Sequence, residues 1–293
     1  WVVVEAENLP LDVDCQTQCA LGGVHSVNSS VGVSVAKVEN NGGPGIVSAE
    51  DAELRAVQCN GNKGAGIRSF GSVVVELFEG AIENQANSNL GYGIMAEGTG
   101  LADSEKHSVV VTGSVEAQNN AAAGIFALGA VHINHFPGGA SVQRTSVISN
   151  NGKGATAWVT REKDGLTKQV NCETDCDLSG VYSEDGSVWA RYVTASNNGD
   201  HGVFAEWDAE LLVGTLAQNG SYGVSVGRNL AADLVTMTGN ALGGAQIGHD
   251  EEARSRGTTG STSLLSGCTI GSNQGDGVRL LGNVDLGITG CNI

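Results

Sequence analysis

Two glutamates, Glu184 and Glu206, lie 22 residues apart, and each follows a glycine by four positions. If the chain repeats with that period along a stack of strands, the two carboxyl groups lie about 5 Å apart. This separation suits the paired carboxyl groups of a retaining glycosidase. Carboxylates on neighbouring strands can also share a calcium ion. A third interpretation is two solvated side chains that point apart, because exposed charges interact weakly.

Other side chains that can contact a sugar surround the two glutamates. They combine aromatic rings, carboxylates and a guanidinium: Trp158, Tyr182, Phe204, Trp207, Asp185, Asp208 and Arg228. Aromatic residues make up only 4% of the chain, so four of them within this short stretch indicate a common role. We predict a carbohydrate-binding groove, with a satellite hydrophobic cluster beneath neighbouring loops as the equally weighted alternative.

A short repeated motif must position these residues. It consists of a glycine, an aliphatic residue, any residue and a small residue, as in Gly-Ile-Val-Ser from Gly45 and Gly-Val-Phe-Ala from Gly202. Eleven full or weaker copies begin at Gly23, Gly45, Gly66, Gly93, Gly124, Gly154, Gly180, Gly202, Gly223, Gly244 and Gly277. The short intervals are 21 or 22 residues. Such self-similarity predicts a repeat architecture.

Alternation within the motif predicts which side chains face inward. The positions one and three after each glycine lie on the same face of a strand. They form an aliphatic column and a mostly small column, and Val203 and Val224 should share one layer. Seventeen positions after several glycines comes an asparagine, which we expect to hydrogen-bond along the stack: Asn40, Asn62, Asn171, Asn197, Asn219 and Asn240.

This pattern resembles the right-handed parallel β-helix repeat of pectate-lyase-like and related secreted proteins. The resemblance covers nearly the whole chain. It implies one all-β domain over residues 1–293, a right-handed parallel β-helix of about eleven coils with loops protruding from one edge. It implies no particular chemistry, because one architecture hosts many functions.

Three long intervals locate the expected loops at about 97–107, 129–139 and 248–260. All three should follow the same strand of their coils and project from one edge. Four short coils, beginning at Gly154, Gly180, Gly202 and Gly223, would then leave a gap of about 19 Å. The outward side chains of those coils would form the floor of the predicted groove.

The seven cysteines indicate a compartment. Cys15 and Cys19 occupy the same sequence context as Cys172 and Cys176, and each pair brackets an insertion in one turn. Two local disulfides would close those turns, which predicts an oxidising, extracellular or cell-surface location. Cys59, Cys268 and Cys291 remain, and at least one of them is not paired within the chain.

The formal net charge of −17 disfavours a nucleic acid or an anionic membrane as a partner. The sequence contains no apolar run long enough to span a bilayer. The chain begins at Trp1 without a methionine, as expected of a domain excised or processed from a longer secreted precursor.

Three functions of different classes remain open. The first is a non-catalytic surface, adhesin or assembly protein whose groove binds a polysaccharide or a surface protein. The second is a polysaccharide lyase or glycoside hydrolase that uses Glu184 and Glu206, with or without calcium; no lyase or hydrolase signature surrounds them. The third is a structural subunit that associates end to end.

Overall fold

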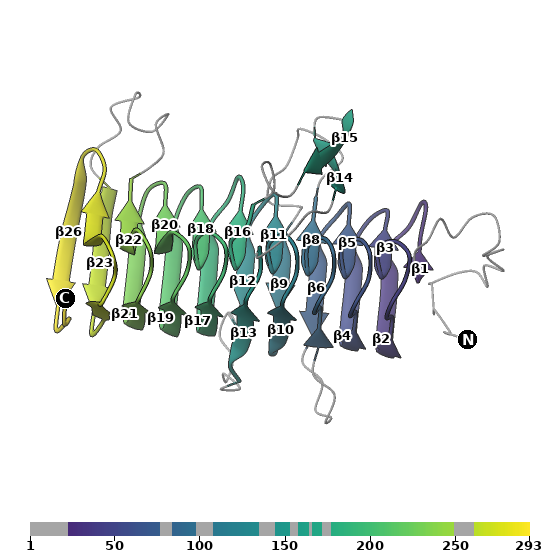
Figure 1. Cartoon of the computed structure of the whole chain (residues 1–293), viewed down its shortest axis with the longest axis horizontal. Coiled ribbons are helices and arrows are strands. Elements are labelled where there is room, and N and C mark those ends of the chain that lie inside the picture. Colours follow the sequence, from purple (N-terminus) through teal and green to yellow (C-terminus); the bar gives the residue numbers. More distant parts are fainter. Residues whose placement is uncertain are drawn as a thin grey trace.

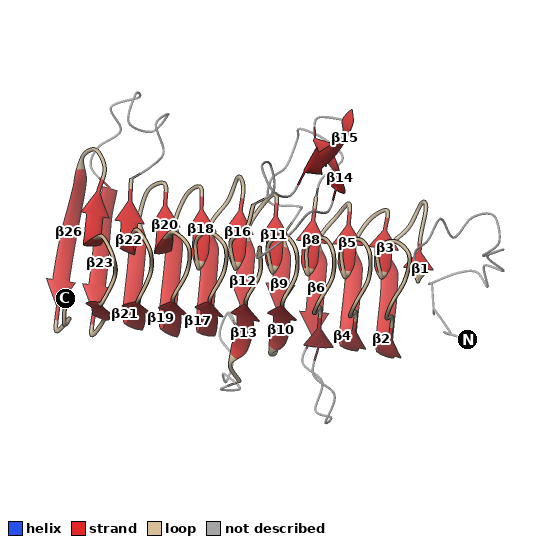
Figure 2. Ribbon diagram, viewed as in Figure 1, coloured by secondary structure: helices blue, strands red, loops and turns tan. Residues whose placement is uncertain are grey.

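The computed structural model describes residues 23–76, 84–97, 108–134, 144–152, 158–163, 166–171, 177–248 and 261–293. All regular secondary structure in these ranges is β-strand, and strands from successive turns of the chain stack in parallel along one axis (Figure 1, Figure 2). The prediction of an all-β fold built from parallel strands is confirmed. The described residues contain no helix that is long and apolar enough to cross a bilayer.

One ten-stranded sheet, here called sheet A, contains the strands at ten of the eleven repeated glycines. Its strands, in order along the stack, are β1 (Val24–His25), β3 (Ile46–Ser48), β5 (Ile67–Ser69), β8 (Ile94–Ala96), β11 (Ile125–Ala127), β16 (Val181–Ser183), β18 (Val203–Ala205), β20 (Tyr222–Val226), β22 (Gly243–Ile247) and β25 (Asp276–Leu280).

A 14-stranded sheet, here called sheet B, completes each coil. Several coils contribute one long strand that bends in the middle, and others contribute two shorter strands. The strands are β2 (Val31–Lys37), β4 (Ala52–Gln58), β6 (Val73–Glu76), β7 (Asn84–Gln85), β9 (Val109–Val111), β10 (Val115–Gln118), β12 (Val131–Ile133), β13 (Ser146–Ser149), β17 (Val188–Ser196), β19 (Ala209–Ala217), β21 (Leu230–Thr238), β23 (Ser261–Ser266), β24 (Thr269–Gly271) and β26 (Val284–Thr289).

Among the described residues, sheet A contains ten strands where eleven coils were predicted, and none of the ten belongs to the copy at Gly154. Strand β11 pairs directly with β16, with Ile125 opposite Val181. After β12 and β13, which join sheet B, the chain forms an antiparallel hairpin of β14 (Trp158–Lys163) and β15 (Leu166–Asn171), which lies outside both sheets (Figure 1). The sequence carried a signal for it, since Asp164-Gly165 is a typical two-residue hairpin turn.

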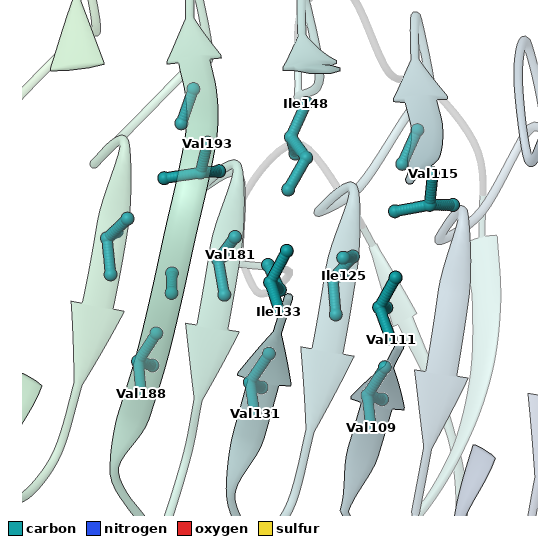
Figure 3. Packing of buried hydrophobic residues seen from close by; sticks show 14 of the residues in the cluster. Val109, Val111, Val115, Ile125, Val131, Ile133, Ile148, Val181, Val188 and Val193 are labelled. Atoms are coloured by element: carbon teal, nitrogen blue, oxygen red, sulfur yellow. The ribbon is translucent and has the colours of Figure 1, made fainter. Parts of the chain in front are cut away.

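The inward columns form the core as predicted. Val203 lies opposite Val224 in register, and both side chains are fully buried. Valine and isoleucine side chains from the two sheets meet between them in successive layers (Figure 3). Each coil therefore buries its apolar side chains against the coils on both sides, which is why repeats of this kind are stable only in a stack.

A ladder of asparagine side chains runs the length of the stack. In each step the side-chain Nδ2 of one asparagine donates to the Oδ1 of the next, at 2.8–3.1 Å. Its members are Asn41, Asn62, Asn89, Asn120, Asn151, Asn198, Asn219, Asn240 and Asn273.

The predicted ladder was therefore correct at three positions and wrong at three. Asn62, Asn219 and Asn240 belong to it, whereas Asn171 lies in β15. Asn40 and Asn197 each lie one residue before a ladder asparagine and have left-handed backbones, with φ of 58° and 55°. The reason is coil length: their coils have 22 residues, so a count of 17 from the glycine stops one short.

A second column of left-handed residues marks the bend in the long sheet B strands. Val35, Ala56, Tyr192, Val213 and Leu234 share it, with φ between 51° and 55°. None of these is glycine, and a left-handed backbone brings Cβ close to the following carbonyl oxygen in any L-residue, at a cost of about 1–2 kcal/mol. The backbone is therefore locally strained at these five aligned positions of sheet B.

Val35→Asn is expected to relieve part of that strain and to raise the free energy of unfolding by about 1 kcal/mol. Asparagine adopts the left-handed region more readily than a β-branched residue, and Val35 is 54% exposed, so little packing is lost. The urea midpoint measures the gain. Val27→Asn is the control, because Val27 is 68% exposed without a positive φ. An equal gain in both variants would contradict the strain argument.

The predicted loops are only partly placed by the structure. Residues 98–107 and 249–260 lie outside the described residues, between β8 and β9 and between β22 and β23. The prediction for 129–139 is wrong in its first half, because Val131–Ile133 form β12, paired with both β9 and β17. The long interval after Gly124 therefore includes ordinary sheet B structure, and its extra residues fall later, within 135–143.

The two predicted disulfides lie outside the described residues, because Cys15, Cys19, Cys172 and Cys176 all fall there. Cys59, Cys268 and Cys291 are described, and each carries a free thiol. Cys59 is fully buried in the core, and this burial raises the pKa of its thiol well above the usual range. It is therefore a structural core residue.

Candidate functional site

The predicted site lies where β16, β18 and β20 end, on three neighbouring coils (Figure 1). Backbone hydrogen bonds set the register there. The amide of Glu184 donates to Ala127 O at 2.9 Å, and the amide of Glu206 donates to Ser183 O at 3.2 Å. The two glutamates thus occupy the same position in successive coils, and both are half-buried.

The coil that follows has no carboxylate at this position. Gly227 continues the column, with its amide donating to Ala205 O at 3.0 Å. The column therefore offers two carboxylates side by side and then a glycine. Neighbouring like charges are unfavourable unless a cation or a shared proton relieves them.

Calcium takes six to eight oxygen ligands. Within the described part of the chain, no three His, Cys, Asp or Glu side chains come together in a way that could hold a metal ion. Glu184 and Glu206 would therefore supply only part of a calcium shell. Catalysis by the same pair requires a substrate bound across both coils.

The aromatic residues of the predicted floor stack on one another. The Tyr182 ring lies 4.6 Å from Phe204 and 5.7 Å from Phe126, centroid to centroid, and both contacts are stacked. Phe126 is fully buried with Tyr92 and Met95 in a second hydrophobic cluster, and Tyr182 packs against it. Both faces of the Tyr182 ring are therefore covered by protein.

This arrangement supports the satellite-cluster interpretation for Tyr182 and Phe204. The rings form a column along sheet A that continues to His201, whose ring lies 5.7 Å from Phe204 and 6.0 Å from Tyr222. A sugar that stacks on an aromatic face would need an open face, and Tyr182 offers none. The sequence could not reveal this, because ring orientation depends on which coils become neighbours.

The backbone of Trp158 belongs to neither sheet A nor sheet B. Trp158 is the first residue of β14, paired with Asn171 in the hairpin outside the sheets. The prediction placed it in the groove floor because Gly154 was counted as the start of a coil. A groove at the predicted place would therefore have three short coils in its floor and not four.

Trp207 and Arg228 form the more exposed part of the site. The Arg228 guanidinium lies 5.0 Å from the centre of the Trp207 ring, a cation–π distance. The amide of Arg228 donates to Trp207 O at 2.8 Å, so the two residues are neighbours in successive coils. Trp207 is half-buried and Arg228 is exposed.

The two aspartates lie in different surroundings. Asp208 Oδ1 accepts hydrogen bonds from Asn229 N at 3.1 Å and Asn229 Nδ2 at 2.7 Å. This carboxylate therefore links the corner before β19 to the corner before β21 in the next coil. Asp185 is exposed. Sequence reasoning missed Asn229, although its position 21 residues after Asp208 was a signal.

The candidate site is acidic overall, because its members on these three coils include four carboxylates and one guanidinium: Glu184, Asp185, Glu206, Asp208 and Arg228. This local balance follows the net charge of the chain. The backbone register places Glu184 and Glu206 at one position of neighbouring coils, and Trp207 and Arg228 contact each other at the next position along the chain. Tyr182 and Phe204 stack in a column of rings, and Asp208 accepts hydrogen bonds from Asn229.

Comparisons with known proteins add no identity. No protein-family model, no curated protein and no solved structure matches this chain.

Proposed function

We propose that this chain is a non-catalytic carbohydrate-binding solenoid that works outside the cytoplasm, on a cell surface or in a secreted assembly. Its finer architecture in this proposal is a right-handed parallel β-helix of the pectate-lyase-like kind. The stacked parallel strands, the columns of like residues and the asparagine ladder all support that architecture.

The observation that carries the proposal is the pairing of Trp207 and Arg228 beside stacked carboxylates. An exposed guanidinium on a half-buried indole gives a surface with both an apolar and a polar part. Sugars have the same mixed character, with apolar ring faces and hydroxyl groups. Glu206, in the same coil as Trp207, and Glu184, in the coil before it, carry carboxylates that can accept hydrogen bonds from such hydroxyls.

Charge narrows the ligand class. Four carboxylates against one guanidinium disfavour a uronic-acid or sulfated polymer. Neutral polysaccharides and those with amino groups fit the site better. A polymer that lies along the stack would meet one set of outward residues per coil.

Trp207→Ala is expected to weaken binding of a neutral or amino-sugar polysaccharide by at least tenfold, because buried aromatic anchors dominate such interfaces. Isothermal titration against a panel of polysaccharides measures the change. Trp189→Ala is the matched control, because Trp189 lies on sheet B strand β17. Equal losses in both variants, or a wild-type chain that binds none of the panel, would overturn the proposal.

A hydrolase remains the second candidate, supported by the position of Glu184 and Glu206 in one column. Strand spacing of about 4.8 Å is close to the separation of about 5–5.5 Å in retaining enzymes. The same polysaccharide panel, assayed for new reducing ends, distinguishes the two. Release of reducing ends by the wild-type chain but not by Glu206→Gln would establish catalysis.

A further inference from the structure

Cys268 and Cys291 occupy the same position in two successive coils. Ser266 at the end of β23 pairs with Thr289 at the end of β26, and Thr269 bridges Asn292 in parallel. The two cysteines fall between these pairs. The residue before each is a left-handed glycine, so both chains turn the same corner in the same way.

Backbone hydrogen bonds fix the spacing on both sides of the cysteines. Gly267 N donates to Thr289 O at 2.9 Å, and Asn292 N donates to Cys268 O at 2.9 Å. Neighbouring strands held in this way lie about 4.8 Å apart. That spacing falls inside the range of Cα separations, about 4.4–6.8 Å, that a disulfide spans.

The two side chains also point the same way. Cys268 belongs to the main core, and Cys291 packs against that core from the next coil. The amide of Cys268 donates to Cys291 Sγ at 3.3 Å, which brings the Cys291 thiol over its neighbour. The corresponding position in the preceding coil is Val235, so the chain places two thiols where an aliphatic side chain stands in the coil before.

The two thiols differ in their accessibility to solvent. Cys268 is 1% exposed, whereas Cys291 is partly exposed. Burial raises the pKa of Cys268, and the neighbouring Cys291 thiol raises it further. An external reagent therefore meets Cys291 first.

We propose that Cys268 and Cys291 form a reversible disulfide between coils, which fastens the coil of β25 and β26 to the one before it. The oxidant is a small-molecule disulfide such as oxidised glutathione. Cys291 loses its proton and attacks one sulfur of the oxidant, which releases one thiol and leaves a mixed disulfide. Cys268 then loses its proton and attacks Cys291 Sγ, which releases the second thiol.

Electrons and protons balance over the two steps. Two protein thiols are oxidised to one disulfide, and one small-molecule disulfide is reduced to two thiols. Excess reduced glutathione reverses both steps. This inference does not depend on the proposed carbohydrate site, which lies on other coils.

The test is incubation of the folded full chain with oxidised glutathione, followed by alkylation and peptide mapping without reduction. We expect a linked pair of peptides containing Cys268 and Cys291, lighter by two hydrogens than their sum. The link should disappear after reduction and persist in Cys59→Ser. Cys291 found only as a glutathione adduct, or linked to another cysteine, would overturn the proposal.

Limited proteolysis gives an independent measurement. Cleavage within residues 276–293 is expected to slow at least fivefold when the wild-type chain is oxidised, because the disulfide holds the outer coil closed. Cys268→Val retains the side-chain type of the neighbouring Val235 and should show the same cleavage rate with and without oxidant. An unchanged rate in the oxidised wild-type chain would show that no fastening occurs.

Discussion

Gly202→Ala is expected to destabilise the whole stack, lowering the free energy of unfolding by about 1–3 kcal/mol or more. A Cβ at this position would lie 2.6 Å from Gly223 O and 2.8 Å from Asn219 Nδ2. Gly223 O belongs to the first residue of the next coil and Asn219 Nδ2 belongs to the asparagine ladder, so neither atom can move without disturbing the backbone pairing or the ladder. The repeated glycine is therefore required by close approach between coils.

The measurement is the urea midpoint by circular dichroism, compared with Gly271→Ala. Gly271 lies in β24, and a Cβ there would meet nothing within 4 Å. Where no clash occurs, replacing glycine by alanine stabilises the folded protein by about 0.4–1 kcal/mol, because it lowers the conformational entropy of the unfolded chain. If Gly202→Ala were as stable as Gly271→Ala, our explanation of the repeated glycine would be wrong.

Asn198→Asp is expected to make stability depend strongly on pH. Asn198 is fully buried, its Nδ2 donates to Ile148 O at 3.2 Å and to Asn219 Oδ1 at 3.0 Å, and its Oδ1 accepts from Asn151. In the ionised Asn198→Asp variant, an oxygen would replace Nδ2 and would face two other oxygens, Ile148 O and Asn219 Oδ1, with no proton to donate. A protonated carboxyl group could still donate to one of them.

The direction follows from this geometry. The folded pKa of the new carboxyl group rises above its unfolded value of about 3.9. Its favourable contribution is present below the unfolded pKa and is lost as pH rises through the folded pKa. The variant therefore loses about 1.4 kcal/mol for each unit of that rise by the time pH exceeds the folded pKa.

Urea titrations of Asn198→Asp at pH 4 and pH 8 measure this loss, with Asn197→Asp as the control. The Asn197→Asp substitution adds the same charge one residue away, at a half-buried corner residue with a left-handed backbone, which aspartate tolerates. Subtracting the control removes the general effect of a more negative chain. A pH dependence shared by both variants would argue against a special role of the ladder.

The architecture was predictable because every coil must satisfy the same local geometry. The glycine permits close approach, and the residues one and three positions later enter the core, so these constraints repeat in the sequence. The prediction failed for the copy at Gly154, because the strand that pairs with β11 is β16, which follows Gly180. Pairing between β11 and β16 is a long-range fact that a local motif does not contain.

The candidate site was predictable in position but not in detail. Counting from Gly180 and Gly202 placed Glu184 and Glu206 in one column, as the backbone hydrogen bonds show. The stacking of Tyr182 between Phe126 and Phe204 could not be foreseen, because Phe126 becomes a neighbour only when the Gly154 coil is absent. One error in the order of the coils thus changed the apparent use of an aromatic side chain.

The asparagine ladder also governs how this protein ages chemically. Asn198 and Asn219 each precede a glycine, the sequence most prone to spontaneous deamidation, in which the next backbone nitrogen attacks the side-chain carbonyl. In the fold, each of those nitrogens already donates to the preceding coil, Gly199 to Asn151 O at 2.8 Å and Gly220 to Asn198 O at 2.9 Å. The attacked carbonyls are held by two donors each. Deamidation at these steps therefore needs local opening, and its rate along the chain records how often each coil comes apart.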